Sequence, residues 1–352
     1  AGEVLLAVPL AKCFPCAGAA RSLLAPLREG GSPEADADDE VEFSEEALVA
    51  VWLCAELHRL DASAFAEELA ALPREMDTIL QWSDEEVAEL RGSCFYEIAS
   101  GLRQETDAEW ETLTSSGRWR GWLAEHPRFD RAQFAWAKSI VMSRQMELDL
   151  PSEGSAAESI KVVAPGPDLF NHDATGSPNC SFEIASAEHE GSITQAVVVQ
   201  CVRDAAPGDE LLFSYGPLPN ASLAIMHGFV VEGNPFDCVE LVLSFAVPQA
   251  KRPWLREIGR VATGLEKPGM VPFEAHGDDD TDPAAEITTI HHLYRARPLP
   301  LTLLATVRLQ VFSVPDLEGL AASAAEVGDA GAGAGGGLCG AAGALRAPGE
   351  GA

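Results

Sequence analysis

Pro167-Asp168-Leu169-Phe170-Asn171-His172 is the first of two short motifs that carry most of the information in this chain. The second is Pro207-Gly208-Asp209-Glu210-Leu211-Leu212-Phe213-Ser214-Tyr215-Gly216. Between them, residues 193–202 are apolar and rich in β-branched side chains, over a length that favours a buried strand. An Asn-His pair alone predicts only a turn with a polar residue.

Other segments extend the pattern on both sides of these motifs. Before them stand Gly2-Glu3-Val4-Leu5-Leu6-Ala7-Val8-Pro9 and Phe134-Ala135-Trp136-Ala137-Lys138-Ser139-Ile140-Val141-Met142-Ser143-Arg144-Gln145. After them come Asn220-Ala221-Ser222-Leu223, Gly228-Phe229-Val230 and Asn234-Pro235, with a weaker echo at Leu309-Gln310-Val311-Phe312-Ser313. In this order the segments resemble the SET domain methyltransferases, and the resemblance implies that the two motifs are the two halves of one active site. Within that family they are similar to the group of the plant Rubisco large-subunit lysine methyltransferase and the actin histidine methyltransferase.

The resemblance implies an α+β fold, with a mainly β, pseudoknotted SET module that is split by a helical insert and followed by a C-terminal helical lobe. The expected parts are residues 1–30 and 160–232 for the module, 44–148 for the insert, 236–320 for a helical substrate-binding lobe and 321–352 for an Ala/Gly-rich disordered tail. In the resembled family, a Gly-rich strand and turn that contact the cofactor precede the Gly-Glu-Val-Leu segment. That first strand and turn are missing from the sequence.

Local patterns favour the same division. Residues 4–8 form an apolar run closed by Pro9, which predicts a strand. Ser44 and Ser83 each precede acidic residues, as expected at helix N-termini, and apolar side chains then recur with helical period. The chain beyond residue 235 also reads as mainly helical.

Composition limits the classes of partner. At 352 residues and 47% hydrophobic, the chain can bury a sizeable core. Its 24 Lys plus Arg against 55 Asp plus Glu give a formal charge of −31, which repels a phosphate backbone, so no nucleic-acid partner is expected. The same charge favours solubility and attracts basic proteins.

Cysteine usage and hydropathy indicate the environment. The eight cysteines are scattered and form no dense disulfide framework, which favours a reducing compartment. The sequence contains no run of about eighteen apolar residues, so no membrane-spanning segment is predicted. We therefore expect a soluble intracellular monomer, in the cytoplasm or the plastid stroma. No metal site is predicted, because His291 and His292 have no further ligand at helical spacing and read as a pair on a helix surface.

The activity that the resemblance implies is methyl transfer from S-adenosyl-L-methionine to a protein substrate that bears a target lysine. A neutral nitrogen must approach the sulfonium methyl from the side opposite the sulfur, so alignment supplies much of the rate. A dry channel and the adjacent sulfonium both lower the pKa of the lysine amine, so no carboxylate base is required. The Tyr-Gly motif implies that Tyr215 is the catalytic residue, with its hydroxyl orienting the amine. Without the neighbouring motifs, a half-buried and hydrogen-bonded tyrosine at a strand end would be the default interpretation.

The resemblance also implies a set of cofactor-binding residues. Arg144, beside Ser143, would lie near the amino-acid end of the cofactor, where a guanidinium can grip a carboxylate bidentately. An ordinary helix end with a basic residue favoured by the dipole is the alternative for this pair. Asn171 and His172 would bind the cofactor through backbone and amide groups, while Asp168 would shape their loop.

The substrate channel is implied at Met146, His227 and Phe229. His227 departs from the pattern of the group, which has a tyrosine before the Gly-Phe pair. The apolar Met146 favours lysine over histidine as the target. Two alternatives stay open: a protein-histidine N-methyltransferase, and a catalytically weak SET-fold protein-interaction module, which the missing first strand and His227 both favour. Cofactor binding separates the module from an enzyme.

Overall fold

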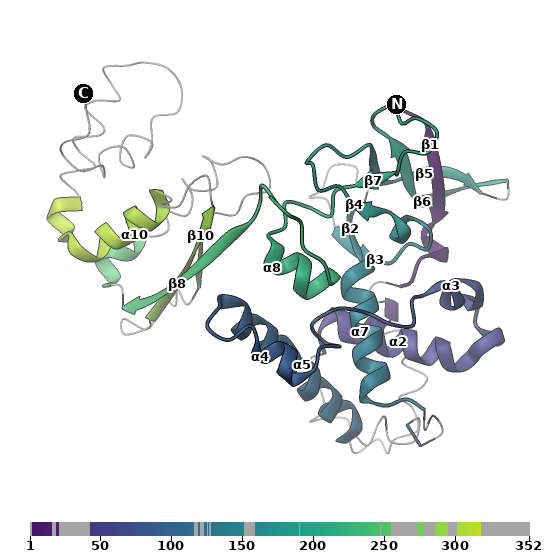
Figure 1. The fold of residues 1–352 in the computed structure, drawn as a ribbon, viewed down its shortest axis with the longest axis horizontal. Helices are drawn as coiled ribbons and strands as arrows, with labels where there is room; N and C mark the ends of the chain where they lie inside the picture. Colours follow the sequence, from purple (N-terminus) through teal and green to yellow (C-terminus); the bar gives the residue numbers. More distant parts are fainter. Residues whose placement is uncertain are drawn as a thin grey trace. The chain divides into compact units, whose positions relative to one another are not determined.

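The structure is a computed structural model that describes residues 2–15, 19–20, 43–115, 119, 123–124, 126, 128–150, 159–189, 191–246, 248–254, 273–276, 286–294 and 301–317. The chain divides into two compact units, Ala1–Asn234 and Pro235–Ala352. In the first unit the strands gather on one side and most of the helices on the other (Figure 1). The predicted disordered tail, 321–352, lies outside the described residues.

The main sheet of the first unit has the order β1-β6-β5 and is antiparallel. Its strands are β1 (Val4–Pro9), β5 (Cys180–His189) and β6 (Ser192–Cys201). The central strand β6 buries its apolar run, with Val197 and Val199 fully inaccessible. The strands predicted from residues 4–8 and 193–202 are therefore confirmed.

Two small sheets complete the module. Strands β2 (Met146–Asp149) and β3 (Ser159–Val162) pair antiparallel. Strands β4 (Asn171–His172) and β7 (Leu212–Phe213) pair in parallel, with Asn171 opposite Leu212 and His172 opposite Phe213. This pairing places the two sequence motifs side by side, as the prediction of one site from two segments requires.

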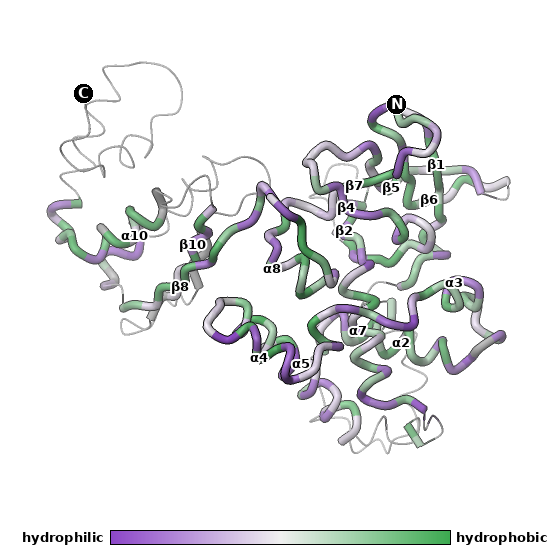
Figure 2. The backbone as a smooth tube through the Cα atoms, viewed as in Figure 1, coloured by the Kyte–Doolittle hydropathy of each residue, from purple (hydrophilic) through white to green (hydrophobic). Residues whose placement is uncertain are grey.

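The insert between β1 and β2 is helical, as predicted. It contains α2 (Glu45–Arg59), α3 (Ala66–Ala71), α4 (Asp84–Ala88), α5 (Cys94–Ser115) and α7 (Arg131–Arg144). Trp52 and Leu53 of α2 share a core cluster with Phe134 and Ile140 of α7. Hydrophobic and hydrophilic residues follow each other along α5, as expected for a helix with one buried side (Figure 2).

A buried lysine joins three helices of the insert. Lys138 of α7 is 1% exposed, and its Nζ lies 2.6 Å from Glu109 Oε2 and 3.2 Å from Glu105 Oε1, both on α5. The backbone N–H and the hydroxyl of Ser44, just before α2, donate to Glu109 Oε1 at 3.0 and 2.6 Å. Because a buried charge is costly unless it is paired and hydrogen-bonded, this network fixes the relative positions of α2, α5 and α7.

The predicted N-cap at Ser83 gives a first testable expectation. The Ser83 hydroxyl accepts from the backbone N–H of Glu86, and Glu86 Oε2 accepts from the backbone N–H of Ser83. Replacing Ser83 with Ala removes the first bond and should lower the free energy of unfolding by about 1 kcal/mol, measured by urea denaturation. Ser115→Ala is the control, because among the described residues the hydroxyl of Ser115 bonds to a carbonyl of its own helix. Equal stabilities for the two variants would contradict the capping role.

The second unit corrects the sequence prediction. Over residues 236–320 we expected mainly helix, but the described part contains β8 (Cys238–Ala246), β9 (Phe273–His276) and β10 (Glu286–Tyr294), in the order β8-β10-β9, before α10 (Leu301–Val311). Apolar side chains recur at every second position from Val239 to Phe245, which is the strand period. His291 and His292 therefore lie on a strand, and His291 is fully buried. Within the described parts of the chain, no helix has the length and apolar character needed to span a bilayer.

Candidate active site

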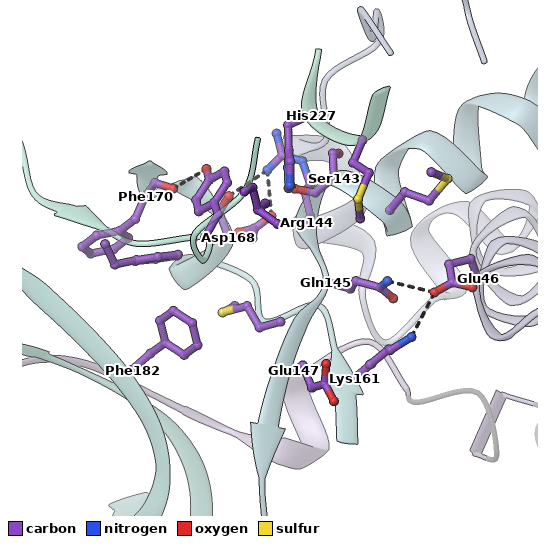
Figure 3. A pocket seen from close by; sticks show the side chains of 16 residues that line it. Glu46, Ser143, Arg144, Gln145, Glu147, Lys161, Asp168, Phe170, Phe182 and His227 are labelled. Carbon is purple, nitrogen blue, oxygen red and sulfur yellow. Dashed lines mark hydrogen bonds and ion pairs between the residues drawn. The ribbon is translucent and has the colours of Figure 1, made fainter. Parts of the chain in front are cut away.

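A cavity of about 380 Å³ lies where α7, β2, β3, the 3-10 turn η5 (Pro167–Leu169) and β7 meet. Side chains from the sheets, from the insert and from the segment after β7 contribute to its wall (Figure 3). The lining residues are Glu46, Met142, Ser143, Arg144, Gln145, Met146, Glu147, Lys161, Asp168, Phe170, Phe182, Phe213, Tyr215, Leu218, Met226 and His227.

Tyr215 follows β7 and is held at both ends. Its hydroxyl donates to the carbonyl oxygen of Phe170 (2.8 Å), and its backbone N–H donates to Nδ1 of His172 (3.1 Å). Burial raises the pKa of Tyr215, and the Asp168 carboxylate adds to this effect while Arg144 opposes it. The phenol is therefore neutral at physiological pH, with its proton directed at Phe170 and its oxygen lone pairs left to accept other hydrogen bonds.

Arg144 ends α7 beside Tyr215. Its Nη1 donates to Asp168 Oδ2 (2.8 Å) and to the Asp168 carbonyl (3.3 Å), while Asp168 Oδ1 accepts from the Gly166 N–H (2.9 Å). The buried Nε of Arg144 has no hydrogen-bond partner among the described residues. The guanidinium is thus oriented by one carboxylate, and the cofactor-binding role of Arg144 stays a prediction.

His227 faces Tyr215 from a different element. It ends a π-helical turn, η6 (Leu223–His227), that follows the short helix α8 (Asn220–Ser222). Its Nδ1 lies 3.1 Å from the Ser143 carbonyl oxygen, and its ring centroid lies 4.8 Å from that of Tyr215. Burial lowers the pKa of His227, and nearby His172 acts in the same direction while the Ser143 bond opposes them.

The structure brings six of the nine predicted site residues onto this cavity: Ser143, Arg144, Met146, Asp168, Tyr215 and His227. Asn171, His172 and Phe229 are not among the lining residues. Asn171 Nδ2 donates to Glu210 Oε1 (2.7 Å), which connects the two motifs. His172 supports the backbone of Tyr215, and the Phe229 ring centroid lies 6.1 Å from that of His227. His172 and Phe229 therefore contact residues of the cavity wall, whereas Asn171 contacts Glu210, which does not line the cavity.

A polar group on the opposite wall was missed by the sequence prediction. Glu46 Oε1 accepts from Gln145 Nε2 (2.9 Å) and from Lys161 Nζ (3.4 Å) (Figure 3). Burial alone would raise the pKa of Glu46, but the bonds from Gln145 and Lys161 outweigh it and leave the pKa below its usual value. In the sequence, Glu46 stands out only as an acidic residue in the first turn of a helix, which does not indicate a cavity residue, and Lys161 belongs to no motif. Phe170 and Phe213 lie inside the quoted motifs, but their spacing does not reveal that they line a cavity.

Comparison with known proteins agrees with this architecture. Residues 36–216 match the SET domain family model. The ribosomal lysine N-methyltransferase set10 of Schizosaccharomyces pombe is 28% identical over 123 residues, which cover 34% of this chain and 21% of that protein. The chain thus spans about a fifth of that relative's length.

Two solved structures have the same fold. The SET domain of LSMT bound to methyl-lysine and AdoHcy is 20% identical with a TM-score of 0.56, covering 88% of this chain and 61% of that one. Rubisco LSMT bound to AdoMet is 21% identical with a TM-score of 0.52, covering 88% and 60%. The predicted α+β fold, with its split module, is confirmed.

Proposed function

Because the SET domain model matches more than half of its residues, the chain belongs to the SET domain family, and we propose that it is an S-adenosyl-L-methionine-dependent protein-lysine N-methyltransferase. One observation carries the proposal. Tyr215, reached through the paired strands β4 and β7, lies on the wall of one cavity with Arg144 and Asp168, and its hydroxyl is oriented by a protein carbonyl.

The residues of the cavity fit this cofactor. The volume of about 380 Å³ is in the range of small-molecule sites. The guanidinium of Arg144 lines the cavity and suits a carboxylate, and the rings of Phe170, Phe213 and Tyr215 suit a cation, because aromatic faces attract positive charge. When bound, S-adenosyl-L-methionine supplies an electrophilic methyl group on a sulfonium sulfur.

The chain's own residues would align the reaction. In the transfer the target nitrogen forms a bond to the methyl carbon while the carbon–sulfur bond breaks, and the electron pair of that bond stays on sulfur. A target lysine must first lose its ammonium proton to water, which a largely apolar wall of aromatic side chains promotes by disfavouring the charged form. Tyr215 cannot donate to the nitrogen without breaking its bond to Phe170, so we assign its oxygen the role of accepting an N–H and orienting the nitrogen lone pair.

Lysine is the target that the observations favour. Met146 is 6% exposed and contributes an apolar thioether to the cavity, beside the rings of Phe182 and Phe213. An aliphatic stem suits such a wall. The curated relative is also named as a lysine methyltransferase.

Calorimetry with S-adenosyl-L-methionine tests the proposal. The wild-type chain should bind one equivalent, and Arg144→Lys should bind about tenfold more weakly, because lysine lacks the planar fork of donors. Arg103→Lys is the matched control, since it makes the same change in an Arg–Asp pair on the insert, where Arg103 Nη2 lies 2.7 Å from Asp84 Oδ1. A wild-type chain that binds no cofactor would support the interaction module instead.

A further inference from the structure

The position of His227 is fixed by backbone contacts of its neighbours. Gly228 caps the C-terminus of the π-helical turn and has a left-handed conformation (φ +78°). A side chain there would clash with the backbone of Asp77, because a Cβ on Gly228 would lie 2.2 Å from the Asp77 carbonyl oxygen. The turn is therefore seated directly on the insert, and the imidazole that precedes Gly228 has little freedom to move away from the cavity.

The hydrogen bond to Ser143 determines the tautomer of His227. A backbone carbonyl oxygen can only accept, so the proton of the neutral ring is on Nδ1 and the lone pair is on Nε2. Burial and the nearby His172 keep the pKa of His227 below the ordinary histidine value, so the neutral form persists at pH 7. Nε2 makes no hydrogen bond to any described residue and is available as an acceptor.

His172 has the opposite tautomer. Its Nδ1 accepts from the backbone N–H of Tyr215, so its proton is on Nε2. Asp168 already accepts from Arg144 and from Gly166. The Tyr215 oxygen and Nε2 of His227 are thus two acceptors on this wall for which the described residues supply no donor.

From this geometry we propose that His227 is a positioning residue, whose Nε2 accepts a hydrogen bond from the N–H of the target side chain. The role rests on the proposed function. A neutral lysine amine has two N–H bonds and one lone pair. Acceptors on Tyr215 and His227 would hold both hydrogens and so direct the lone pair at the methyl group, before the nitrogen–carbon bond forms and the carbon–sulfur bond breaks. A tyrosine, which the related pattern has at this position, would add a hydroxyl in place of the fixed acceptor.

His227→Phe tests the role, because it retains a ring against Tyr215 and removes both nitrogens. We expect kcat for methyl transfer to fall by about tenfold to a hundredfold, while KM and the affinity for S-adenosyl-L-methionine change by less than about threefold. His189→Phe is the control, since it removes an imidazole from the exposed end of β5 and should leave kcat unchanged. Wild-type kinetics in His227→Phe would overturn the proposal.

The pH profile distinguishes positioning from packing. For the wild type, log kcat should fall with decreasing pH at a slope of about one as the target lysine becomes protonated, and steepen toward two when His227 gains a proton and Nε2 stops accepting. The steeper limb should lie below the ordinary histidine pKa of about 6.5, because the pKa of His227 is lowered. His227→Gln supplies an acceptor that does not titrate and should show no steepening from this residue.

The other titratable groups near this ring are retained in His227→Gln, so the difference between the two profiles reports on His227 alone. They are His172 on β4, Tyr215 after β7, and the Arg144–Asp168 pair. If His227→Phe does not fold, the pH profile of kcat for His227→Gln alone tests whether His227 positions the target nitrogen. Identical profiles for wild type and His227→Gln would refute the role even if methyl transfer itself is intact. A wild-type chain that transfers no methyl group would overturn the proposed function and this role with it.

Discussion

Replacement of Tyr215 with Phe should lower kcat for methyl transfer by about a hundredfold or more and leave cofactor affinity within about threefold of wild type. The change removes one oxygen that, in the proposed mechanism, orients the target nitrogen in the transition state, and the loss of such a group typically costs two to three orders of magnitude. The ring itself remains between His172 and His227, whose centroids lie 5.2 and 4.8 Å away. The packing of the wall is therefore retained.

Steady-state kinetics on Tyr215→Phe and Tyr96→Phe would make the comparison. Tyr96 is partly buried on α5 in a separate hydrophobic cluster, so its hydroxyl is a matched control that lies off the cavity wall. If both variants keep wild-type kcat, Tyr215 is only a packing residue. If Tyr215→Phe loses cofactor binding together with activity, its hydroxyl acts in cofactor binding instead of orienting the nitrogen.

Gly228→Ala should have the largest effect on stability, lowering the free energy of unfolding by about 3 kcal/mol. Two costs combine. An L-residue at a left-handed φ costs about 1–2 kcal/mol, and a Cβ at 2.2 Å from the Asp77 carbonyl oxygen forces the turn away from the insert, as in an overpacked core. Because the same turn carries His227, activity should fall as well.

Gly176→Ala separates the two costs. Gly176 has φ +70°, close to that of Gly228, but a Cβ there would meet no atom within 4 Å. This variant should therefore lose only the conformational part, about 1–2 kcal/mol. Denaturant unfolding of both variants measures the difference. Equal losses of unfolding free energy in the two variants would show that a side chain at Gly228 does not clash with Asp77.

The local signals in the sequence predicted the elements that depend on nearest neighbours. The β-branched run of β6, the strand closed by Pro9 and the N-cap at Ser83 are each determined by short-range chemistry. The side-by-side placement of the two motifs was predicted from the resemblance alone. The parallel pairing of His172 with Phe213 involves strands too short to show a hydrophobic period in either segment.

The sequence prediction failed where tertiary contacts place a residue on the cavity, and where the hydrophobic period of a strand is weak. Glu46 and Lys161 reach the same cavity from α2 and β3, and no local pattern reports that meeting. In the second unit, residues 238–246 alternate with strand period, but their side chains are partly buried or exposed, so the alternation is weaker than in a buried strand. Residues 286–294 place Ile287, Ile290 and Leu293 three apart, which is not the strand period. The bond from Arg144 to Asp168 also joins two separate elements, α7 and η5, and no local pattern reports it.

Transfer of labelled methyl groups from S-adenosyl-L-methionine to proteins of a lysate of the source cell tests the central claim most directly. The wild-type chain should label a discrete protein band, Tyr215→Phe should not, and acid hydrolysis of the band should release methyl-lysine. Methyl-histidine in the hydrolysate would show that the target residue is histidine. No labelled band, together with no cofactor binding by calorimetry, would contradict the methyltransferase account and leave a SET-fold interaction module in its place.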